Sequence, residues 1–195
     1  KTVGTNPSLC ASATTLELPP GGGDVTYCYT VTNTGNTAFG LHDLFDDQLG
    51  SLLDGLVFSL SPQSSVFLTQ TTVITTTTTN NATWTAYNTE PDDGVEDQAS
   101  ATVNVQAPNP AVTLTKTVGT DPSLCASSTT LDLPPGGGNV TYCYTVANTG
   151  NIAFGLHDLV DDRLGSILDG FVFSLSPQSS VFLTQTTVIT TTTTN

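Results

Sequence analysis

The residues best suited to chemistry are a histidine and three aspartates in LHDLFDDQLG, residues 41–50. This group consists of His42, Asp43, Asp46 and Asp47, and it recurs as His157, Asp158, Asp161 and Asp162. Imidazole and carboxylate groups can bind a metal ion or transfer protons. However, adjacent residues of a strand point to opposite faces, and no Ser, Cys or second His lies nearby at a catalytic spacing. We therefore favour the other interpretation, a strand that runs into an acidic turn.

A second acidic group lies in EPDDGVEDQ, residues 90–98. Its carboxylates are Glu90, Asp92, Asp93, Glu96 and Asp97, gathered around Gly94. Clustered carboxylate oxygens at a tight turn are ligands that Ca²⁺ prefers, although the spacing does not match an EF-hand loop. Calcium is one interpretation, and a solvated acidic hairpin loop is the one we favour. No other cofactor is expected.

Lys116 is predicted to point inward, because it shares the alternation face of Leu114 and Val118. An inward lysine is rarely left unpaired in a core. In the following strand Asp158 shares its face with Leu156, so we predict a buried ion pair between Lys116 and Asp158. A lysine at the strand edge that reaches water is the alternative.

A covalent alternative to the ion pair is an amide bond between the inward lysine and an Asn or Asp side chain. The asparagine on a late strand of this repeat is Asn104, which lies between Val103 and Val105. Because the valines are predicted to face inward, Asn104 is predicted to face outward. The sequence therefore argues against such a bond at Asn104.

Two N-x-T sequons offer glycosylation sites at Asn81 and Asn139. Threonine runs at residues 75–79 and 190–194 also present rows of hydroxyls that could carry O-linked sugar. Strand propensity explains the threonine runs without any glycan. Glycosylation is thus an open alternative for both features.

The four cysteines are Cys10, Cys28, Cys125 and Cys143. They fall as two equivalent pairs, and two thiols cannot complete a four-ligand zinc site. We predict the disulfides Cys10–Cys28 and Cys125–Cys143 and hence an oxidising, extracellular compartment. Alternation in VTYCYTV turns Cys28 away from the face of Tyr27 and Tyr29, so the bridge is expected outside the core. Buried free thiols are the alternative.

These residues are positioned by a long internal repeat. Residues 1–80 align on residues 116–195 without a gap and differ at only ten positions. VTYCYTVTNTGN, from Val25 to Asn36, recurs almost unchanged as VTYCYTVANTGN, from Val140 to Asn151. A period of this length indicates the same domain built in tandem.

Side-chain alternation and turn residues predict an all-β fold. Strands are expected at residues 14–18, 25–31, 39–45, 65–79 (one or two), 81–87, 99–105 and 111–118. About seven strands in one repeat fit a two-sheet sandwich. We predict tandem β-sandwich domains: repeat 1 at residues 1–107 with its first strand partly missing, a proline-containing linker at 108–111, and a truncated repeat 2 at 112–195 that lacks its last strands. The proline-containing linker predicts a stiff connection.

Composition excludes some partners. Three basic residues face seventeen acidic ones, for a net charge of −14. Nucleic acid and anionic membrane surfaces require a basic patch, so neither is expected as a partner. No direct membrane insertion is expected in this segment.

The motifs YTVTNTGN, LHDLFDDQLG and NATWTAY followed by ASATVNV resemble the "conserved repeat domain" family of bacterial and archaeal surface proteins. The resemblance covers the whole repeat. It implies an Ig-like β-sandwich, usually in tandem, of unknown molecular function and with no catalytic residues. It further implies a secreted or cell-surface structural role.

The leading hypothesis is a non-enzymatic structural repeat protein of an extracellular filament, sheath or cell-surface stalk. Its domains are expected to stack head to tail and self-associate, by chain continuation or by strand donation between subunits. One alternative is an adhesin or binding module for a glycan or a protein partner. A second alternative is a non-catalytic segment of a large secreted enzyme.

Overall fold

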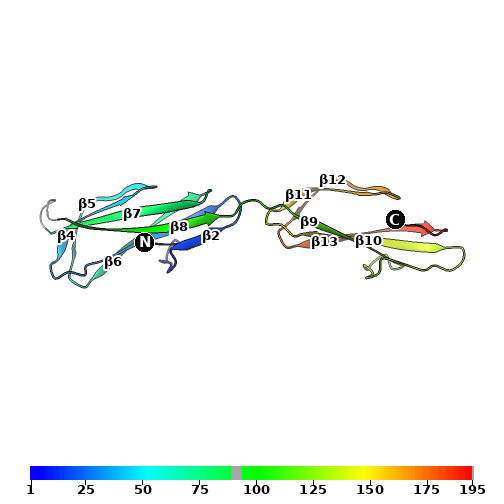
Figure 1. Ribbon diagram of the computed structural model, residues 1–195, viewed down its shortest axis with the longest axis horizontal. Helices are drawn as coiled ribbons and strands as arrows, with labels where there is room; N and C mark the ends of the chain where they lie inside the picture. Colours follow the sequence, from blue (N-terminus) through cyan, green and yellow to red (C-terminus); the bar gives the residue numbers. More distant parts are fainter. Residues whose placement is uncertain (89–93, 195) are drawn as a thin grey trace. The chain divides into compact units, whose positions relative to one another are not determined.

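The computed structural model describes residues 1–88 and 94–194 (Figure 1). The chain divides into two compact units, Lys1–Ala107 and Pro108–Asn195. Within the described residues every regular element is a β-strand, so the all-β prediction is confirmed. The described part of the chain holds no helix with the length and apolarity to cross a membrane.

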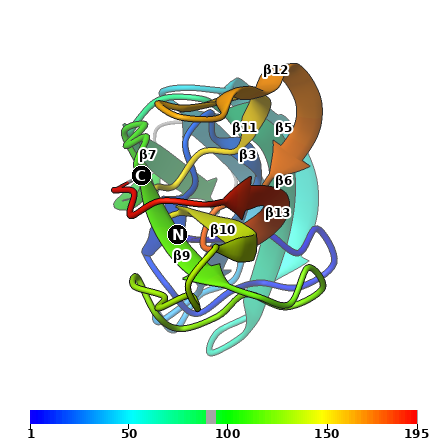
Figure 2. The ribbon, with the colours of Figure 1, turned by 90° about the vertical axis from the view of Figure 1, so that its right-hand side faces the viewer.

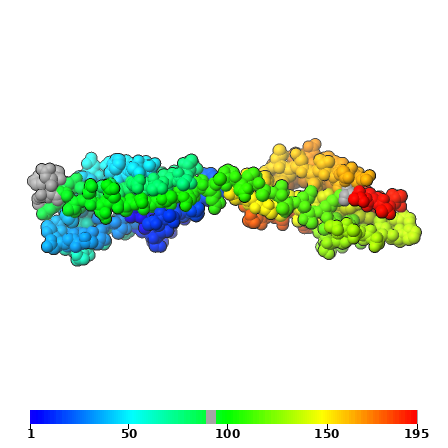
Figure 3. Space-filling view, viewed as in Figure 1, coloured from blue at the N-terminus to red at the C-terminus, as the bar shows by residue number. Residues whose placement is uncertain are grey.

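Unit 1 contains eight described strands in two sheets. They are β1 (Thr2–Gly4), β2 (Thr15–Leu18), β3 (Gly23–Thr32), β4 (Phe39–Asp46), β5 (Gly50–Leu60), β6 (Ser65–Ile74), β7 (Thr78–Tyr87) and β8 (Val95–Val105). One sheet has the order β1-β3-β6, and the other has the order β2-β8-β7-β4-β5. Among the described strands of this unit, only β2 runs parallel to its neighbour, β8. In Figure 3, β7 and β8 lie side by side across the visible face of this unit.

The core of unit 1 lies between these sheets. It is formed by Val25, Tyr27 and Tyr29 from β3 and by residues such as Leu44 and Trp84 from the other sheet. Alternation explains this, because every second residue of a strand points to the same face. Apolar faces from two sheets that share one core are consistent with a β-sandwich.

Unit 2 contains five described strands. They are β9 (Val112–Gly119), β10 (Gly138–Asn148), β11 (Phe154–Asp161), β12 (Gly165–Leu175) and β13 (Ser180–Ile189). Figure 2 shows β9, β10 and β13 side by side, and they form one sheet in the order β13-β10-β9. The second sheet holds only β11 and β12. The core is correspondingly smaller and includes Val140, Tyr142, Tyr144 and Leu159.

The segment TLDL, residues 130–133, differs from its near-identical counterpart in unit 1. TLEL forms β2 by pairing with β8 through Thr15↔Thr102 and the three positions that follow, whereas residues 130–133 are not a strand. None of the described strands of unit 2 pairs with residues 130–133. The two segments are therefore nearly identical in sequence and differ in whether a strand lies beside them.

The recurring NTGN motif, residues 33–36 and 148–151, is a turn organised by a buried asparagine. Asn33 Nδ2 donates hydrogen bonds of 2.8 Å to Thr37 O and 2.9 Å to Leu60 O. Its Oδ1 accepts a hydrogen bond of 3.0 Å from Gly35 N. Asn148 makes the same set of bonds in unit 2. One amide thus satisfies three backbone groups, which gives the asparagine a structural role in both turns.

The glycine turn PPGGG also has a steric reason to recur. Gly22 has φ 76°, and a Cβ there would lie 1.8 Å from Ile74 O. Gly137 has φ 79°, and a Cβ there would likewise lie 1.8 Å from Ile189 O. Only glycine fits a positive φ so close to a backbone carbonyl.

Strand β5 and its counterpart β12 were not predicted from the sequence. The pairing of β5 with β4 contains register shifts, and Gly55 inside β5 has φ 63°. A bulge interrupts the two-residue alternation of side chains between the faces of a strand. The adjacent residues Leu52 and Leu53 therefore do not fit the alternation that was used to predict strands. The expected seven strands therefore become eight described strands in unit 1.

Candidate functional site

Three polar side chains meet in the core of unit 1, and we call them the Lys–Asp–Asn cluster: Lys1, Asp46 and Asn80. Lys1 precedes β1, Asp46 ends β4 and Asn80 lies in β7. Strands β4 and β7 are neighbours, with Asp46 paired to Ala82. Asn80 shares the inward face of Ala82 because it lies two residues away. The cluster therefore joins the three-stranded sheet to the five-stranded one.

Asp46 is the centre of the hydrogen bonds in this cluster. Its Oδ2 accepts from Lys1 Nζ at 2.7 Å and from the Tyr29 hydroxyl at 2.6 Å. Its Oδ1 accepts from Gln48 N and Leu49 N, both at 3.0 Å. Lys1 Nζ also donates to Asn80 Oδ1. The carboxylate is thus held on both oxygens, and the amine lies between a carboxylate and a carboxamide.

The cluster is shielded from water. The Lys1 side chain is 1% exposed and that of Asp46 is 0% exposed. Asn80 is likewise fully buried. Lys1 Nζ lies 4.6 Å from the ring centroid of Tyr27 and 5.0 Å from that of Tyr29. A buried lysine of this kind depends on its partners, since an isolated charge in a core is very costly.

Burial sets the protonation of the cluster. It lowers the pKa of the Lys1 side chain and outweighs the opposing effect of the hydrogen bond with Asp46. Burial acts to raise the pKa of Asp46, but the hydrogen bonds from Lys1 and Tyr29 outweigh it and hold that pKa below its ordinary value. Burial raises the pKa of Tyr29, so its hydroxyl remains a donor. These shifts make the Lys1 amine easier to deprotonate and the Asp46 carboxylate harder to protonate.

The amide nitrogen of Asn80 is unusual. Among the described residues, Asn80 Nδ2, the Tyr27 hydroxyl and His42 Nε2 are buried without a hydrogen bond of acceptable geometry. Burial raises the pKa of Tyr27, and the Asn80 amide opposes that rise, so the two groups are close enough to interact. An amide N–H group that is buried without a good acceptor costs about 1–3 kcal/mol. Its presence in a core calls for a chemical reason.

Unit 2 contains the equivalent amine and carboxylate, and this corrects one prediction. Lys116 Nζ lies 2.6 Å from Asp161 Oδ2, which also accepts from the Tyr144 hydroxyl. The prediction that Asp158 is the partner of Lys116 was wrong. Asp158 Oδ1 instead accepts a hydrogen bond of 2.6 Å from Gly170 N. The Lys116 side chain is 24% exposed, more than that of Lys1.

The partner of Lys116 was predicted wrongly because the inward face of β11 was predicted wrongly. Leu156 and Leu159 are three residues apart and cannot share a face of a regular strand. The prediction placed Leu156 inward, but Leu156 is 65% exposed whereas Leu159 and Asp161 are buried. Lys116 itself points inward, as predicted.

The histidine and aspartates of residues 41–50 are divided between the two faces of β4 and the turn after it. His42 and Asp46 are buried, and the His42 ring stacks on Phe58 at a centroid distance of 3.9 Å. Asp43 Oδ1 instead accepts from Gly55 N. Asp47 accepts from Asn81 N and Nδ2 at 2.9 and 2.8 Å. The four side chains therefore do not converge on one point.

The predicted calcium loop is only partly described. Glu90, Asp92 and Asp93 lie outside the described residues, and Glu96 and Asp97 are exposed on β8. Within residues 1–88 and 94–194, no group of three or more His, Cys, Asp or Glu side chains is arranged to hold a metal ion. Calcium at this loop stays a prediction.

The two sequons lie on exposed strand positions. Asn81 is exposed on β7, where its amide bonds Asp47, and Asn139 is exposed on β10. Asn104 points out of the core, as expected, and its Nδ2 donates a hydrogen bond of 2.6 Å to Glu17 Oε1. Glycosylation of Asn81 and Asn139 stays a prediction.

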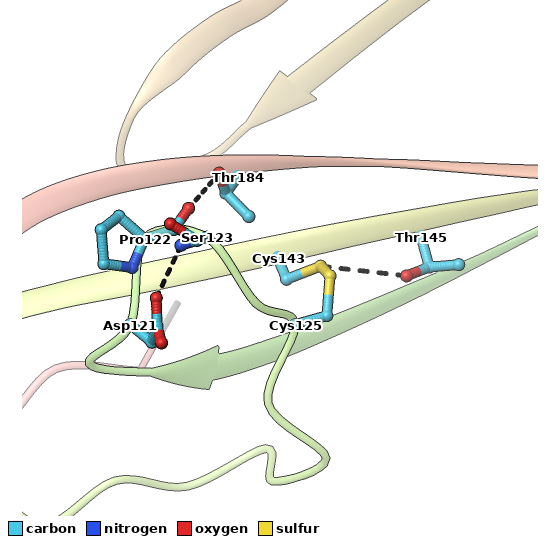
Figure 4. Close-up of a disulfide and its surroundings, with 7 residues drawn as sticks. All are labelled: Asp121, Pro122, Ser123, Cys125, Cys143, Thr145 and Thr184. Atoms are coloured by element: carbon cyan, nitrogen blue, oxygen red, sulfur yellow. Dashed lines mark hydrogen bonds between the residues drawn. A yellow bond between two sulfur atoms is a disulfide. The ribbon is translucent and has the colours of Figure 1, made fainter.

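Both predicted disulfides are present, Cys10–Cys28 and Cys125–Cys143, each with 5.3 Å between Cα atoms. Cys28 and Cys143 lie on the central strands β3 and β10, on the face opposite the core tyrosines. Figure 4 shows Cys125 on the loop of unit 2, joined to Cys143. Thr184 Oγ1 also donates a hydrogen bond of 3.0 Å to Pro122 O of this loop. Each disulfide thus fastens a loop to the outer side of the three-stranded sheet.

Asp46 and Asn80 were not predicted as partners of a lysine. Alternation places Ala82, Trp84 and Ala86 inward, and the same alternation extended by two residues puts Asn80 inward. A polar residue in line with buried alanines was the available signal.

Comparisons with known proteins provide no family assignment. No protein-family model matches this chain, and no curated protein matches it.

Proposed function

We propose that this chain is part of a structural repeat protein of an extracellular filament, sheath or cell-surface stalk. Its Ig-like domains would follow one another in series along the chain, without catalytic activity. The resemblance of its motifs to the conserved repeat domain of bacterial and archaeal surface proteins supports this proposal. The two disulfides are compatible with an extracellular location.

The open sheet of unit 2 is the observation that carries the proposal. In unit 1, β4 pairs with both β5 and β7. In unit 2, the equivalent strand β11 pairs only with β12 among the described strands, and Leu156 is 65% exposed. A strand with free backbone groups beside an apolar side chain favours the addition of another strand.

Unit 1 also has a strand edge without a neighbouring strand among the described residues, at the end of β3. In unit 2, Val112–Thr115 pair with the end of β10. In unit 1, the equivalent edge of β3, residues 30–33, instead lines a cavity of about 630 Å³ together with Lys1 and Trp84. A strand of the same kind as Val112–Thr115 would fit this edge. We propose that neighbouring repeats fill both openings, by chain continuation or by strand donation between copies.

The surface chemistry agrees with such a role. A net charge of −14 with only three basic residues gives mutual repulsion between chains and no attraction to nucleic acid. Association then has to rely on strand pairing and apolar contact at defined edges. Such contacts give a specific, propagating assembly.

Immunogold electron microscopy of the source cells tests this proposal, with an antibody raised against the purified chain. We expect gold particles along fibres, a sheath or stalks at the cell surface. Labelling inside the cytoplasm, or only on dispersed secreted protein, would contradict the proposed function. Pre-immune serum provides the control.

A further inference from the structure

We propose that unit 1 forms an internal isopeptide bond between Lys1 Nζ and Asn80 Cγ, with Asp46 as the catalytic acid and base. The cluster has the three groups that such a reaction needs: an amine, a carboxamide and a carboxylate. This inference concerns chemistry within one unit and does not depend on the proposed function.

The nucleophile already contacts its target. Lys1 Nζ donates a hydrogen bond to Asn80 Oδ1, the carbonyl oxygen one bond from the carbon to be attacked. Lys1 and Asn80 are 79 residues apart in the sequence, so the fold alone brings them together. Holding reacting groups in contact converts an intermolecular reaction into an intramolecular one and removes much of its entropic barrier.

The site favours the reactive form of the amine. An ammonium group has no lone pair, so lysine attacks only when neutral. Burial lowers the pKa of the Lys1 side chain, which is 1% exposed. Exclusion of water also limits hydrolysis of the amide as the competing reaction.

Asp46 is placed to transfer the proton. Its Oδ2 lies 2.7 Å from Lys1 Nζ, within the range for direct proton transfer. The hydrogen bonds to Oδ1 from Gln48 N and Leu49 N fix the carboxylate. The Tyr29 hydroxyl, 2.6 Å from Oδ2, stabilises the carboxylate before and after the transfer.

The leaving group is Asn80 Nδ2. It makes no good hydrogen bond with any described residue, so no described partner holds it in place. As Nζ bonds to Cγ, Asp46 takes one proton from Nζ and passes it to Nδ2, and the Cγ–Nδ2 bond breaks. The products are one amide bond, one ammonia molecule and the regenerated Asp46 carboxylate. No oxidant, metal or cofactor is required.

The bond would tie the two sheets together. Lys1 enters β1 in the three-stranded sheet, and Asn80 lies in β7 of the five-stranded sheet. The Cys10–Cys28 disulfide fastens a loop to one sheet only, whereas the isopeptide bond would cross the core. It would also survive reducing agents.

The sequence repeats the same three residue types in unit 2 as Lys116, Asp161 and Asn195. Lys116 and Asp161 form the equivalent ion pair. Asn195 lies outside the described residues, so the inference is made for unit 1 alone.

Mass spectrometry of the purified 195-residue chain tests the bond. After reduction and alkylation, loss of ammonia should lower the intact mass by about 17 Da for each bond formed. Proteolytic fragments should include a branched peptide that joins Lys1 to Asn80. The first cycle of N-terminal sequencing should yield no free lysine derivative. A succinimide at Asn80 gives the same mass loss but no branched peptide, and this result would overturn the proposal.

Adjacent residues provide matched controls. Asn80→Ala and Asp46→Asn should each remove the mass loss assigned to unit 1 and the branched peptide. Asn81→Ala and Asp47→Asn change exposed neighbours and should retain both. The wild-type chain decides the matter even if a core variant fails to fold. If wild-type chain with both disulfides formed carries an unmodified Lys1 and Asn80, the proposal is wrong.

Discussion

Trp84 Nε1 donates a hydrogen bond of 3.2 Å to His42 Nδ1 in the core of unit 1. Because Nδ1 accepts this bond, the His42 ring is neutral in the folded unit, with its proton on Nε2. Burial lowers the pKa of His42 below its ordinary value. Trp84 is the single tryptophan of the chain, so its fluorescence reports on unit 1 alone.

The first prediction concerns the pH dependence of unit 1. Unfolded His42 gains a proton as the pH falls through about 6.5, whereas folded His42 resists protonation until a lower pH. The free energy of unfolding should therefore fall between about pH 7.5 and about pH 5.5. Urea unfolding followed by Trp84 fluorescence measures this change. In His42→Gln the change should largely disappear; an equal change in both chains would contradict the prediction.

The second prediction concerns the disulfides. Replacing Cys10 and Cys28 by serine opens a link with a sequence separation of 18 residues. This should lower the free energy of unfolding of unit 1 by about 3 kcal/mol. Urea unfolding followed by Trp84 fluorescence measures the loss. The matched variant without Cys125 and Cys143 should leave the Trp84 transition unchanged, and equal shifts in the two variants would show that the disulfides do not act within their own units.

The third prediction concerns the NTGN turn. Asn33→Ala removes three hydrogen bonds from a buried site and should destabilise unit 1 by roughly 3 kcal/mol. Asn36 is exposed, and Asn36→Ala should change stability by less than about 0.5 kcal/mol. The same fluorescence assay compares the two. Similar losses at both positions would mean that the turn is not organised by Asn33.

Much of the fold could be predicted because residues 25–31, 81–87 and 101–105 alternate between apolar or small side chains that face the core and side chains that face away from it. Strand β5 could not, since its bulges and the positive φ of Gly55 break the two-residue period. Strand β2 shows a further limit. Nearly the same four residues form a strand beside β8 in unit 1 and no strand in unit 2, so their local pattern alone does not decide the outcome.

The inward lysine of the candidate site was predicted, but its partners were not. Alternation correctly turned Lys116 inward, but two leucines three residues apart left the face of the next strand ambiguous, and the partner proved to be Asp161. Asn80 was overlooked because it ends a threonine run that strand propensity already explained. Pairings between strands distant in the sequence bring these residues together, and local patterns do not contain those pairings.

The fourth prediction concerns the open sheet of unit 2. A copy of residues 81–105 added after Asn195 supplies counterparts of β7 and β8. It should pair with β11, cover Leu156 and slow backbone hydrogen exchange in Phe154–Asp161. Hydrogen–deuterium exchange with mass spectrometry measures this. A scrambled copy of the same residues should have no effect, and unchanged exchange with the native copy would mean that β11 does not accept a strand.

Electron cryomicroscopy of material isolated from the surface of the source cells most directly tests whether these repeats build an extracellular fibre. We predict a filament, sheath or stalk of repeated β-domains in which every counterpart of β11 is paired on both sides. The added strand should come from the adjoining repeat or from another copy. Dispersed domains, or a fibre in which the counterparts of β11 remain paired on one side only, would contradict this.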